Sequence, residues 1–413
     1  MTTEKKLLVI GKVWPEPDSS AAGSRMLQLL KGFKLHGWDI TFSSASAKNE
    51  YSADLSKQNI REKPIRLNHN SFNTFIENLQ PNAVLFDRFM TEEQFGWRVA
   101  ESCPDALKIL DTEDLHSLRK SRQNAIEQGV EWHHKDLKAL DVAKRELASI
   151  YRCDLTLMIS EAEMNILTIH FELDRKLIHY IPFLYPQITE KQIGEWPSFE
   201  ERSNFVTIGN FLHTPNKDSV YFLKSDIWPL IRKELPNAKM NIYGAYVSSN
   251  IQYLNDESSG FFIKGRAKSA AEVLKSARVC LAPLRFGAGL KGKLAESMQL
   301  GTPTGTTTIG AEGMNGALDW PGFIEDNPQK FAEGAISLYT DKYKWQKAQM
   351  NGADIINQRF NAENFYPELF EKITALSNHL ESHRRENFIG SMLMHHTTGA
   401  SRYMSKWIEE KNK

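Results

Sequence analysis

Short apolar runs alternate with longer amphipathic segments along most of the chain. Near the start, the apolar run Leu7–Ile10 is followed by a loop rich in Pro, Ser and Gly, and then by Ser24–His36, whose apolar residues recur with a helical period. Ser24 is predicted to cap this helix and Gly37 to end it. Residues 39–43 are predicted to be a strand, which completes a β-α-β unit. Further elements of this half are predicted as strands at Ala83–Phe86, Leu107–Leu110, Leu155–Ile159 and Leu177–Ile181, and as a long helix at about residues 130–151.

The second half of the chain repeats this alternation. Helices are predicted at Ser219–Leu235, Ala270–Ala277 and Leu294–Leu300, between strands at Phe205–Ile208, Met240–Tyr243, Phe261–Lys264, Val279–Ala282 and Thr304–Thr306. Strands that alternate with helices predict parallel sheets covered by helices on both faces. We therefore expect an α/β protein with two doubly wound, Rossmann-like domains, whose ligands lie in the cleft at the carboxyl ends of the strands.

A polar segment that contains two prolines separates the halves and is predicted to be a linker. We predict an N-terminal domain at residues 1–185, the linker at 186–203 and a C-terminal domain at 204–360. Residues 361–413 are predicted to be a helix and tail that pack back toward the N-terminal domain. In this region Asn364 is expected to cap a helix that reaches Leu380, with Pro367 in its first turn. For the tail, 377–413, an amphipathic membrane-surface segment stays open beside the packed helix.

Composition narrows the class of protein. The 413 residues are 41% hydrophobic and 25% charged, as in soluble globular proteins with more than one core. No apolar run approaches the length of a membrane span, and the first run is too short for a signal peptide. The three cysteines, at 103, 153 and 280, lack metal-like spacing and indicate a reduced, cytoplasmic protein. Because 51 basic residues balance 51 acidic ones, we expect small ligands and no nucleic-acid partner, while peripheral membrane contact stays open.

Residues 279–306 are chemically the most informative segment. They are predicted to be a buried strand, a glycine-rich loop, a helix, a Gly-Thr-Pro turn and a second short strand. A glycine loop at the start of a helix directs unpaired backbone N–H groups outward, and the helix dipole favours an anion there. Arg285, Lys291 and Lys293 add full positive charges, in a region where residues 261–293 hold eight Lys/Arg and one acid, Glu272. We expect this loop to bind phosphate.

The same loop nearly matches the P-loop of ATPases, with Gly287, Gly292 and Lys293 at the required spacing. A P-loop needs Ser or Thr next, to hold magnesium, and Leu294 stands there instead. The loop also comes late in the chain, whereas a P-loop normally lies in the first β-α unit of its domain. The ATPase interpretation is therefore disfavoured.

Several segments together resemble a known family, the family-4 retaining glycosyltransferases, which have the GT-B fold. Residues 205–216 resemble the opening strand and loop of the family's C-terminal domain, and Pro15–Thr41 resembles its first β-α-β unit. Weaker similarities lie at 110–119 and 154–163. The most specific segment resembles the donor-binding region and reads Pro283…Arg285…Gly287-x-Gly289-x-Lys291-x-Lys293-x-x-Glu296-x-Met298-x-x-Gly301-x-Pro303…Thr306…Gly310-x-Glu312-Gly313.

The resemblance implies a hexosyltransferase that moves a sugar from a nucleotide-diphosphate-sugar donor to a saccharide, lipid-linked or other acceptor, with retained anomeric configuration. It implies no metal and no cofactor, the nucleotide sugar being a substrate, because basic residues and backbone amides stabilise the leaving diphosphate. By position, Arg285 and Lys293 would stabilise the diphosphate, and His116 would lie near the transferred sugar. Glu296 would accept hydrogen bonds from the ribose. The other donor-binding positions are Gly23, Gly209, Asn210, Gly289, Leu290 and Lys291.

Plainer interpretations stand beside these roles. Without the resemblance, Glu296 would be an acid that favours a helix N-terminus. For His116, a solvated cap stays open equally beside a place near the transferred sugar. Asp111 and Asp114 are interpreted as cap and surface residues, because two carboxylates without a further ligand rarely make a metal site.

The chain departs from the family pattern at two positions. The family commonly has two glutamates separated by seven residues, and the first falls on Ala288; an arginine is usual where Asn210 stands. Arg285, Lys291 and Lys293 are expected to supply the missing charge, so we interpret the chain as an atypical, active member. The alternatives are a non-catalytic GT-B partner that binds nucleotide sugars, and a nucleotide-sugar epimerase.

Overall fold

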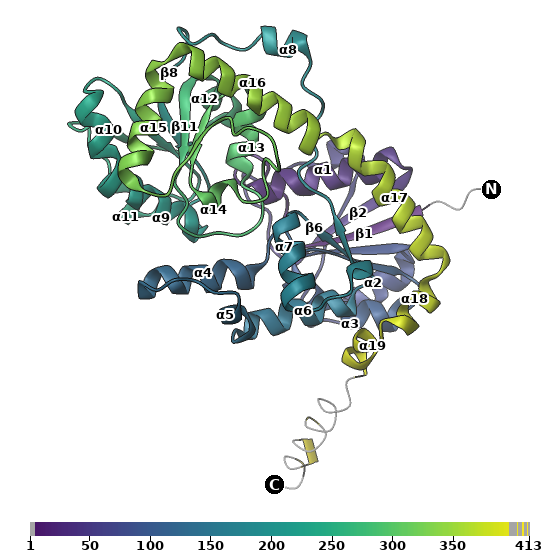
Figure 1. The fold of residues 1–413 in the computed structure, drawn as a ribbon. Helices are drawn as coiled ribbons and strands as arrows, with labels where there is room; N and C mark the ends of the chain where they lie inside the picture. The colour runs from purple at the N-terminus through teal and green to yellow at the C-terminus, as the bar shows by residue number, and fades with distance from the viewer. Residues whose placement is uncertain (1–4, 396–402, 404–406, 409–410, 412–413) are drawn as a thin grey trace.

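The computed structural model describes residues 5–395 together with residues 403, 407, 408 and 411. Figure 1 shows two lobes, the first coloured purple to teal and the second green, and the yellow C-terminal helices return along the first lobe. Each lobe is built on one all-parallel sheet with its own apolar core. The α/β class and the two Rossmann-like sheets expected from the sequence are confirmed.

The N-terminal sheet has seven strands in the order β3-β2-β1-β4-β5-β6-β7, so the strand order reverses between β1 and β4. All strands except β3 were predicted. The strand β3 lies at the edge of the sheet, is mostly exposed and ends in a proline, so it lacks the apolar run that marks a buried strand. The strands are β1 Lys5–Gly11, β2 Trp38–Ser44, β3 Arg61–Pro64, β4 Ala83–Asp87, β5 Leu107–Asp111, β6 Leu155–Met158 and β7 Ile178–Tyr180.

Two predictions about the helices of this domain were wrong. Helix α1 begins before Ser24, because the Ser20 hydroxyl caps it by accepting a hydrogen bond from the Gly23 amide at 3.1 Å. The long helix at 130–151 is replaced by α5 and α6, since the Asp136 carboxylate accepts from the His133 amide and starts a separate short turn. The helices are α1 Ala21–Leu35, α2 Ser71–Leu79, α3 Phe89–Ser102, α4 His116–Gln128, α5 Lys135–Lys138, α6 Asp141–Arg152 and α7 Glu161–Asn165.

The C-terminal sheet has six strands in the order β10-β9-β8-β11-β12-β13. The sequence predicted all but β13, which is a three-residue edge strand. The strands are β8 Ser203–Ile208, β9 Met240–Tyr243, β10 Phe261–Gly265, β11 Ala277–Ala282, β12 Thr304–Thr306 and β13 Gly322–Ile324. The helices are α8 Glu190–Gly194, α9 Thr214–Phe222, α10 Trp228–Glu234, α11 Ser249–Gln252, α12 Ala270–Ser276, α13 Gly292–Gln299, α14 Thr308–Ala311, α15 Pro328–Thr340 and α16 Lys342–Arg359.

The described chain ends with the helices α17 Ala362–Asn378, α18 Leu380–Glu386 and α19 Phe388–Met394. Asn361 caps α17 by accepting from the Glu363 amide, so the predicted cap at Asn364 was wrong, and Pro367 lies beyond the first turn. Apolar residues of α17 are buried in the same core cluster as β1, β2 and α1; they are Tyr366, Leu369, Phe370 and Ile373. Part of the tail lies outside the described residues, namely 396–402, 404–406, 409–410 and 412–413. The membrane-surface interpretation of the tail is therefore not tested there.

The segment between the two sheets is held at both ends. The Asn357 side chain accepts from the Ile188 amide at 2.6 Å, and the wholly buried Arg202 donates to the Thr302 hydroxyl at 2.6 Å. The polar composition of residues 186–203 had predicted a linker but not these contacts. Within the described residues, no helix is both long and apolar enough to cross a membrane.

Candidate active site between the two domains

A cavity of about 650 Å³ lies between the two domains. The N-terminal domain contributes residues that follow β1, β4 and β5, and the C-terminal domain contributes the loops after β8, β9 and β11 together with the start of α13. These are the carboxyl ends of parallel strands in both sheets, where open α/β sheets bind ligands. The cavity therefore lies where the alternation of strands and helices had predicted the ligands.

The N-termini of α1 and α13 meet beside this cavity. A Cβ added to Gly292 would lie 2.3 Å from the Cβ of Ala21, so only glycine permits this approach. Within the described part of the chain, no side chain caps α13 and no acid lies in its first turn. Uncapped N–H groups and the positive end of the helix dipole therefore face a cavity large enough for a ligand, which suits an anion.

Two lysines at the start of α13 line the cavity. Lys293 Nζ donates to the Asn216 side chain at 2.9 Å, and Lys291 Nζ donates to the Gly289 carbonyl at 2.6 Å. Burial lowers the pKa of each ammonium group to about 8. Both lysines therefore remain largely charged at neutral pH, and a phosphate close to either would favour that charge further.

Glu296 lies one turn further along α13 and also lines the cavity. Burial raises the pKa of its carboxyl group to about 7, although the charge of Lys293 opposes this. A helix-favouring acid would lie in the first turn, whereas Glu296 lies beyond it. A half-buried carboxylate that faces a cavity can accept hydrogen bonds from hydroxyl groups of a ligand.

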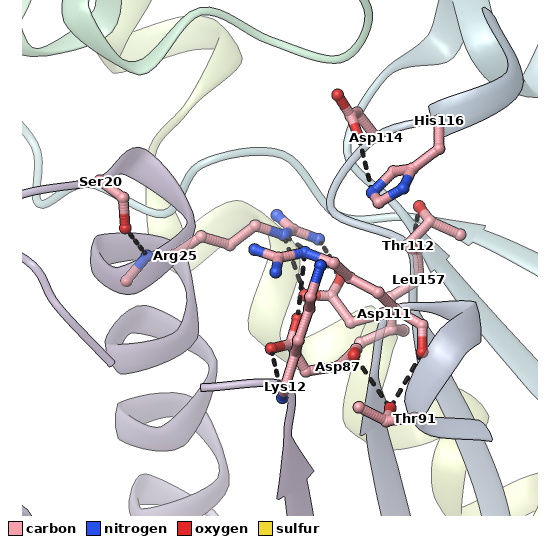
Figure 2. Close-up of polar contacts among 12 residues, drawn as sticks. Lys12, Ser20, Arg25, Asp87, Thr91, Asp111, Thr112, Asp114, His116 and Leu157 are labelled. Carbon is pink, nitrogen blue, oxygen red and sulfur yellow. Dashed lines mark hydrogen bonds and ion pairs between the residues drawn. The ribbon is translucent and has the colours of Figure 1, made fainter. Parts of the chain in front are cut away.

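His116 is the first residue of α4 and lines the opposite wall. Its Nε2 lies 3.4 Å from Asp114 Oδ1, and its ring meets that of Phe89 edge-on, with centroids 5.4 Å apart. Figure 2 shows the imidazole pointing toward the Asp114 carboxylate. Burial lowers the pKa of His116 to about 4, against the charge of Asp114. The imidazole is therefore neutral at pH 7, and its mostly buried ring does not fit a solvated cap.

Asp111 was interpreted as a cap or surface residue, and this was wrong. Its carboxylate is wholly buried and pairs with Arg25, whose Nη2 lies 2.9 Å from Asp111 Oδ1 (Figure 2). Arg25 also donates to the carbonyls of Ile181 and Pro182 at 2.7 and 2.9 Å. This buried pair holds α1 against the ends of β5 and β7, and so positions the N-terminal wall of the cavity.

Three predicted site residues do not present the expected group to the cavity. Arg285 is exposed, pairs with Asp218 and lies outside the cavity lining. The Gly289 amide donates to Glu163 at 2.8 Å, so this N–H is not free, and Gly23, which was expected to bring the N-terminal loop close to the diphosphate, lies outside the cavity lining. The predicted positions that do line the cavity are His116, Gly209, Asn210, Leu290, Lys291, Lys293 and Glu296.

Direct contacts hold the two domains together. Arg122 on α4 donates to both carboxylate oxygens of Glu312, at 2.8 and 2.7 Å, and to the Gly287 carbonyl at 3.0 Å. Glu163 on α7 accepts from the amides of Leu115 and Gly289 at 2.9 and 2.8 Å, which joins the domains through one buried carboxyl group. The structure is therefore a closed arrangement around the cavity.

Three cations of the N-terminal wall were missed in the sequence. Lys12 follows β1, Arg88 follows β4 and Arg119 lies on α4, and all three line the cavity. The signal for the first two was their place directly after predicted strands, but the sequence does not show that β1 and β4 are neighbours. Among the described residues, no group of three or more His, Cys, Asp or Glu is arranged to hold a metal ion.

Comparison with known proteins agrees with this geometry. Residues 202–341 match the family described as Glycosyl transferases group 1. The two facing parallel-sheet domains match solved GT-B structures over nine-tenths of the chain. The chain has the GT-B fold, and part of its C-terminal domain is similar to group 1 glycosyl transferases. No curated protein sequence matches the chain.

The similar GT-B structures have little sequence identity to this chain. Anabaena HepE, solved with UDP and glucose, has a TM-score of 0.64 at 12% identity, over 90% of this chain and 100% of that one. Sucrose-phosphate synthase from Thermosynechococcus elongatus has a TM-score of 0.66 at 13% identity, over 90% and 99%. A variant of S. aureus TarM, solved with fondaparinux, α-GlcNAc-glycerol and UDP, has a TM-score of 0.66 at 12% identity, over 91% and 100%.

Proposed function

We propose that this protein transfers a sugar from a nucleotide-diphosphate sugar to an acceptor, in the cavity between its two domains. The observation that carries this proposal is the uncapped N-terminus of α13, which faces the cavity with Lys291 and Lys293 beside it and Glu296 one turn away. Helix N–H groups and ammonium groups suit a diphosphate, and a carboxylate suits the hydroxyls of a ribose. Structures of the same fold, such as that of HepE, were solved with UDP.

The proposed reaction needs no metal and retains the anomeric configuration. Negative charge grows on the diphosphate as the glycosidic bond breaks, and the preorganised donors at the start of α13 would stabilise it, which lowers the barrier. The acceptor would approach from the N-terminal wall, on the face that the diphosphate leaves, where the neutral His116 can hydrogen-bond the sugar. We also propose a cytoplasmic location, which three buried and unpaired cysteines support.

A non-catalytic protein that binds nucleotide sugars is the second candidate. Ala288 lines the cavity at the position where the resemblance leads one to expect a glutamate. A methyl group cannot accept a hydrogen bond from the sugar, so this observation favours binding without turnover.

Thermal unfolding in the presence of UDP, GDP, ADP and the matching nucleosides tests the donor site. A ligand at about 100 times its Kd stabilises the folded state by ~2.7 kcal/mol, which raises Tm by several degrees. We expect one nucleoside diphosphate to raise Tm well above its nucleoside, because the phosphates contact α13. The proposal would be contradicted if no diphosphate exceeded its nucleoside.

A further inference from the structure

The N-terminal wall of the cavity includes Arg88, whose guanidinium group makes no hydrogen bond to any described residue. Arg88 follows β4, lines the cavity and has a side chain that is 17% exposed. The Oδ1 atom of Asp87 lies 3.6 Å from its Nε, which is beyond hydrogen-bond length, and no described residue accepts a hydrogen bond from its guanidinium group. Because Arg88 lines the cavity, its N–H donors are open to a ligand that enters there.

The backbone at this position is strained. Arg88 has a φ of 71° and a ψ of 156°, a combination that is essentially confined to glycine. Strain of this kind costs free energy and is concentrated at ligand-binding and active sites. The position also lies between β1 and β4, where the strand order reverses and ligands of such sheets bind.

A second cation lies at the same part of the cavity. The backbone amide of Lys12 donates to Asp87 Oδ2 at 3.0 Å, and Lys12 lines the cavity together with Arg88. Burial and the charge of Arg88 lower the pKa of Lys12, and the charge of Asp87 opposes this shift. The carboxylate of Asp87 therefore contacts both the backbone of Lys12 and the guanidinium group of Arg88.

Several other acids line the cavity, and one of them, Glu16, accepts hydrogen bonds from Asn49 and Tyr246. Burial and the charge of Asp111 raise the pKa of Glu113 well above its usual range, which favours the neutral form of this carboxyl group. Asp114 pairs with Arg119. Asp18 lies near Glu296, on which its charge acts, at the end of the cavity assigned above to the ribose. The N-terminal wall thus presents two cations, Arg88 and Lys12, to the cavity.

We propose that Arg88 and Lys12 bind a phosphate or carboxylate group of the acceptor, so that the transferase uses anionic acceptors. The planar guanidinium group can hold two oxygens of such a group at once, and the lysine adds a point charge. The site lies on the wall opposite α13, and is distinct from the proposed diphosphate site. The identification of this ligand as the acceptor rests on the proposed function, whereas the presence of an anion site does not.

Calorimetric titration of the full chain saturated with UDP tests this site. The probes are glucose 6-phosphate, glucuronate and glucose, which separate a phosphate, a carboxylate and a neutral sugar. We expect at least one of the two anions to bind about tenfold more tightly than glucose. Arg88→Gln and Lys12→Met should each weaken that anion about tenfold and leave glucose unchanged, and Arg88→Gly, which suits the positive φ, should act like Arg88→Gln.

Two matched controls lie outside the cavity: Arg61→Gln, whose arginine pairs with Asp39 on the surface, and Lys31→Met on the exposed face of α1. Both should leave anion binding unchanged. Equal affinity for glucose and both anions, absence of anion binding, or equal losses in the controls would overturn the inference. So would competition between UDP and the anion, because the anion would then occupy the diphosphate site. If UDP itself fails to bind, the proposed function fails, whereas anion binding that is lost in Arg88→Gln would still support the site.

Discussion

At the scale of single residues, Lys293 has the most direct part in the proposed diphosphate site. Its ammonium group contacts Asn216 and lies at the uncapped start of α13. We expect Lys293→Ala to weaken UDP binding about tenfold to a hundredfold and to change uridine binding little, because the lost charge faces the phosphates. The measurement is calorimetric titration with both ligands, and Arg285→Ala is the control, because Arg285 lies outside the cavity. Equal losses for UDP and uridine would contradict this placement.

Glu296 predicts a dependence of nucleoside binding on pH. Burial raises the pKa of Glu296 to about 7, and the ionised carboxylate is the better acceptor for ribose hydroxyls. Uridine affinity should therefore be complete well above this pKa and should fall as the pH drops through about 7, by several-fold in all. Titration between about pH 5.5 and 8.5 checks this, and Glu296→Gln should flatten the profile. An unchanged profile in that variant would assign the effect to another group.

Whether a predicted site residue lines the cavity depends on how far apart in the chain its partners lie. Lys291, Lys293 and Glu296 share one short segment, so a local pattern is enough to bring them to one place. The side chain of Arg285 pairs with Asp218 on α9, a residue far from it in the sequence, so its position outside the cavity could not be predicted locally. The site at Arg88 could not be predicted from a local sequence pattern, because it combines residues that follow β1 and β4, which are far apart in the chain.

At the scale of elements, the strands that were predicted are those buried within the sheets, because they read as continuous apolar runs. The edge strands β3 and β13 are short and partly exposed, so nothing distinguishes them from loops. Helix starts were harder to place because several capping residues lie close together. Ser20 and Ser24 are equally suitable by type, but in the structure Ser20 accepts from the Gly23 amide while the Ser24 hydroxyl donates to the Pro17 carbonyl.

The packing of α17 on the N-terminal domain predicts an effect on stability. Phe370 is buried against Phe33, with ring centroids 5.0 Å apart, and stacks on His36. Phe370→Ala should lower the free energy of unfolding by about 3–5 kcal/mol, since it removes a buried ring. Phe388→Ala, at a side chain that is 69% exposed, should change it by less than ~0.5 kcal/mol. Urea unfolding compares the two variants. If Phe370→Ala lowered the free energy of unfolding as little as Phe388→Ala, α17 would not stabilise this domain.

At the scale of the whole molecule, the cavity exists because two sheets face each other with their carboxyl ends. The contact of Gly292 with Ala21 and the pair formed by Arg122 and Glu312 set this closed arrangement. Each contact joins residues from different domains, so no local pattern in the sequence could show it. The sequence nevertheless indicated the fold, because the alternation of strands and helices in both halves restricts the arrangement of each sheet.

The most direct test of the account is release of nucleoside diphosphate from a panel of UDP-, GDP- and ADP-sugars by the full chain. We expect that one donor is consumed, that a chelator leaves the rate unchanged and that Lys293→Ala lowers the rate about a hundredfold or more. Binding of a nucleoside diphosphate without release from any donor would favour the non-catalytic candidate. Neither binding nor release with any donor would contradict the assignment of the α13 site.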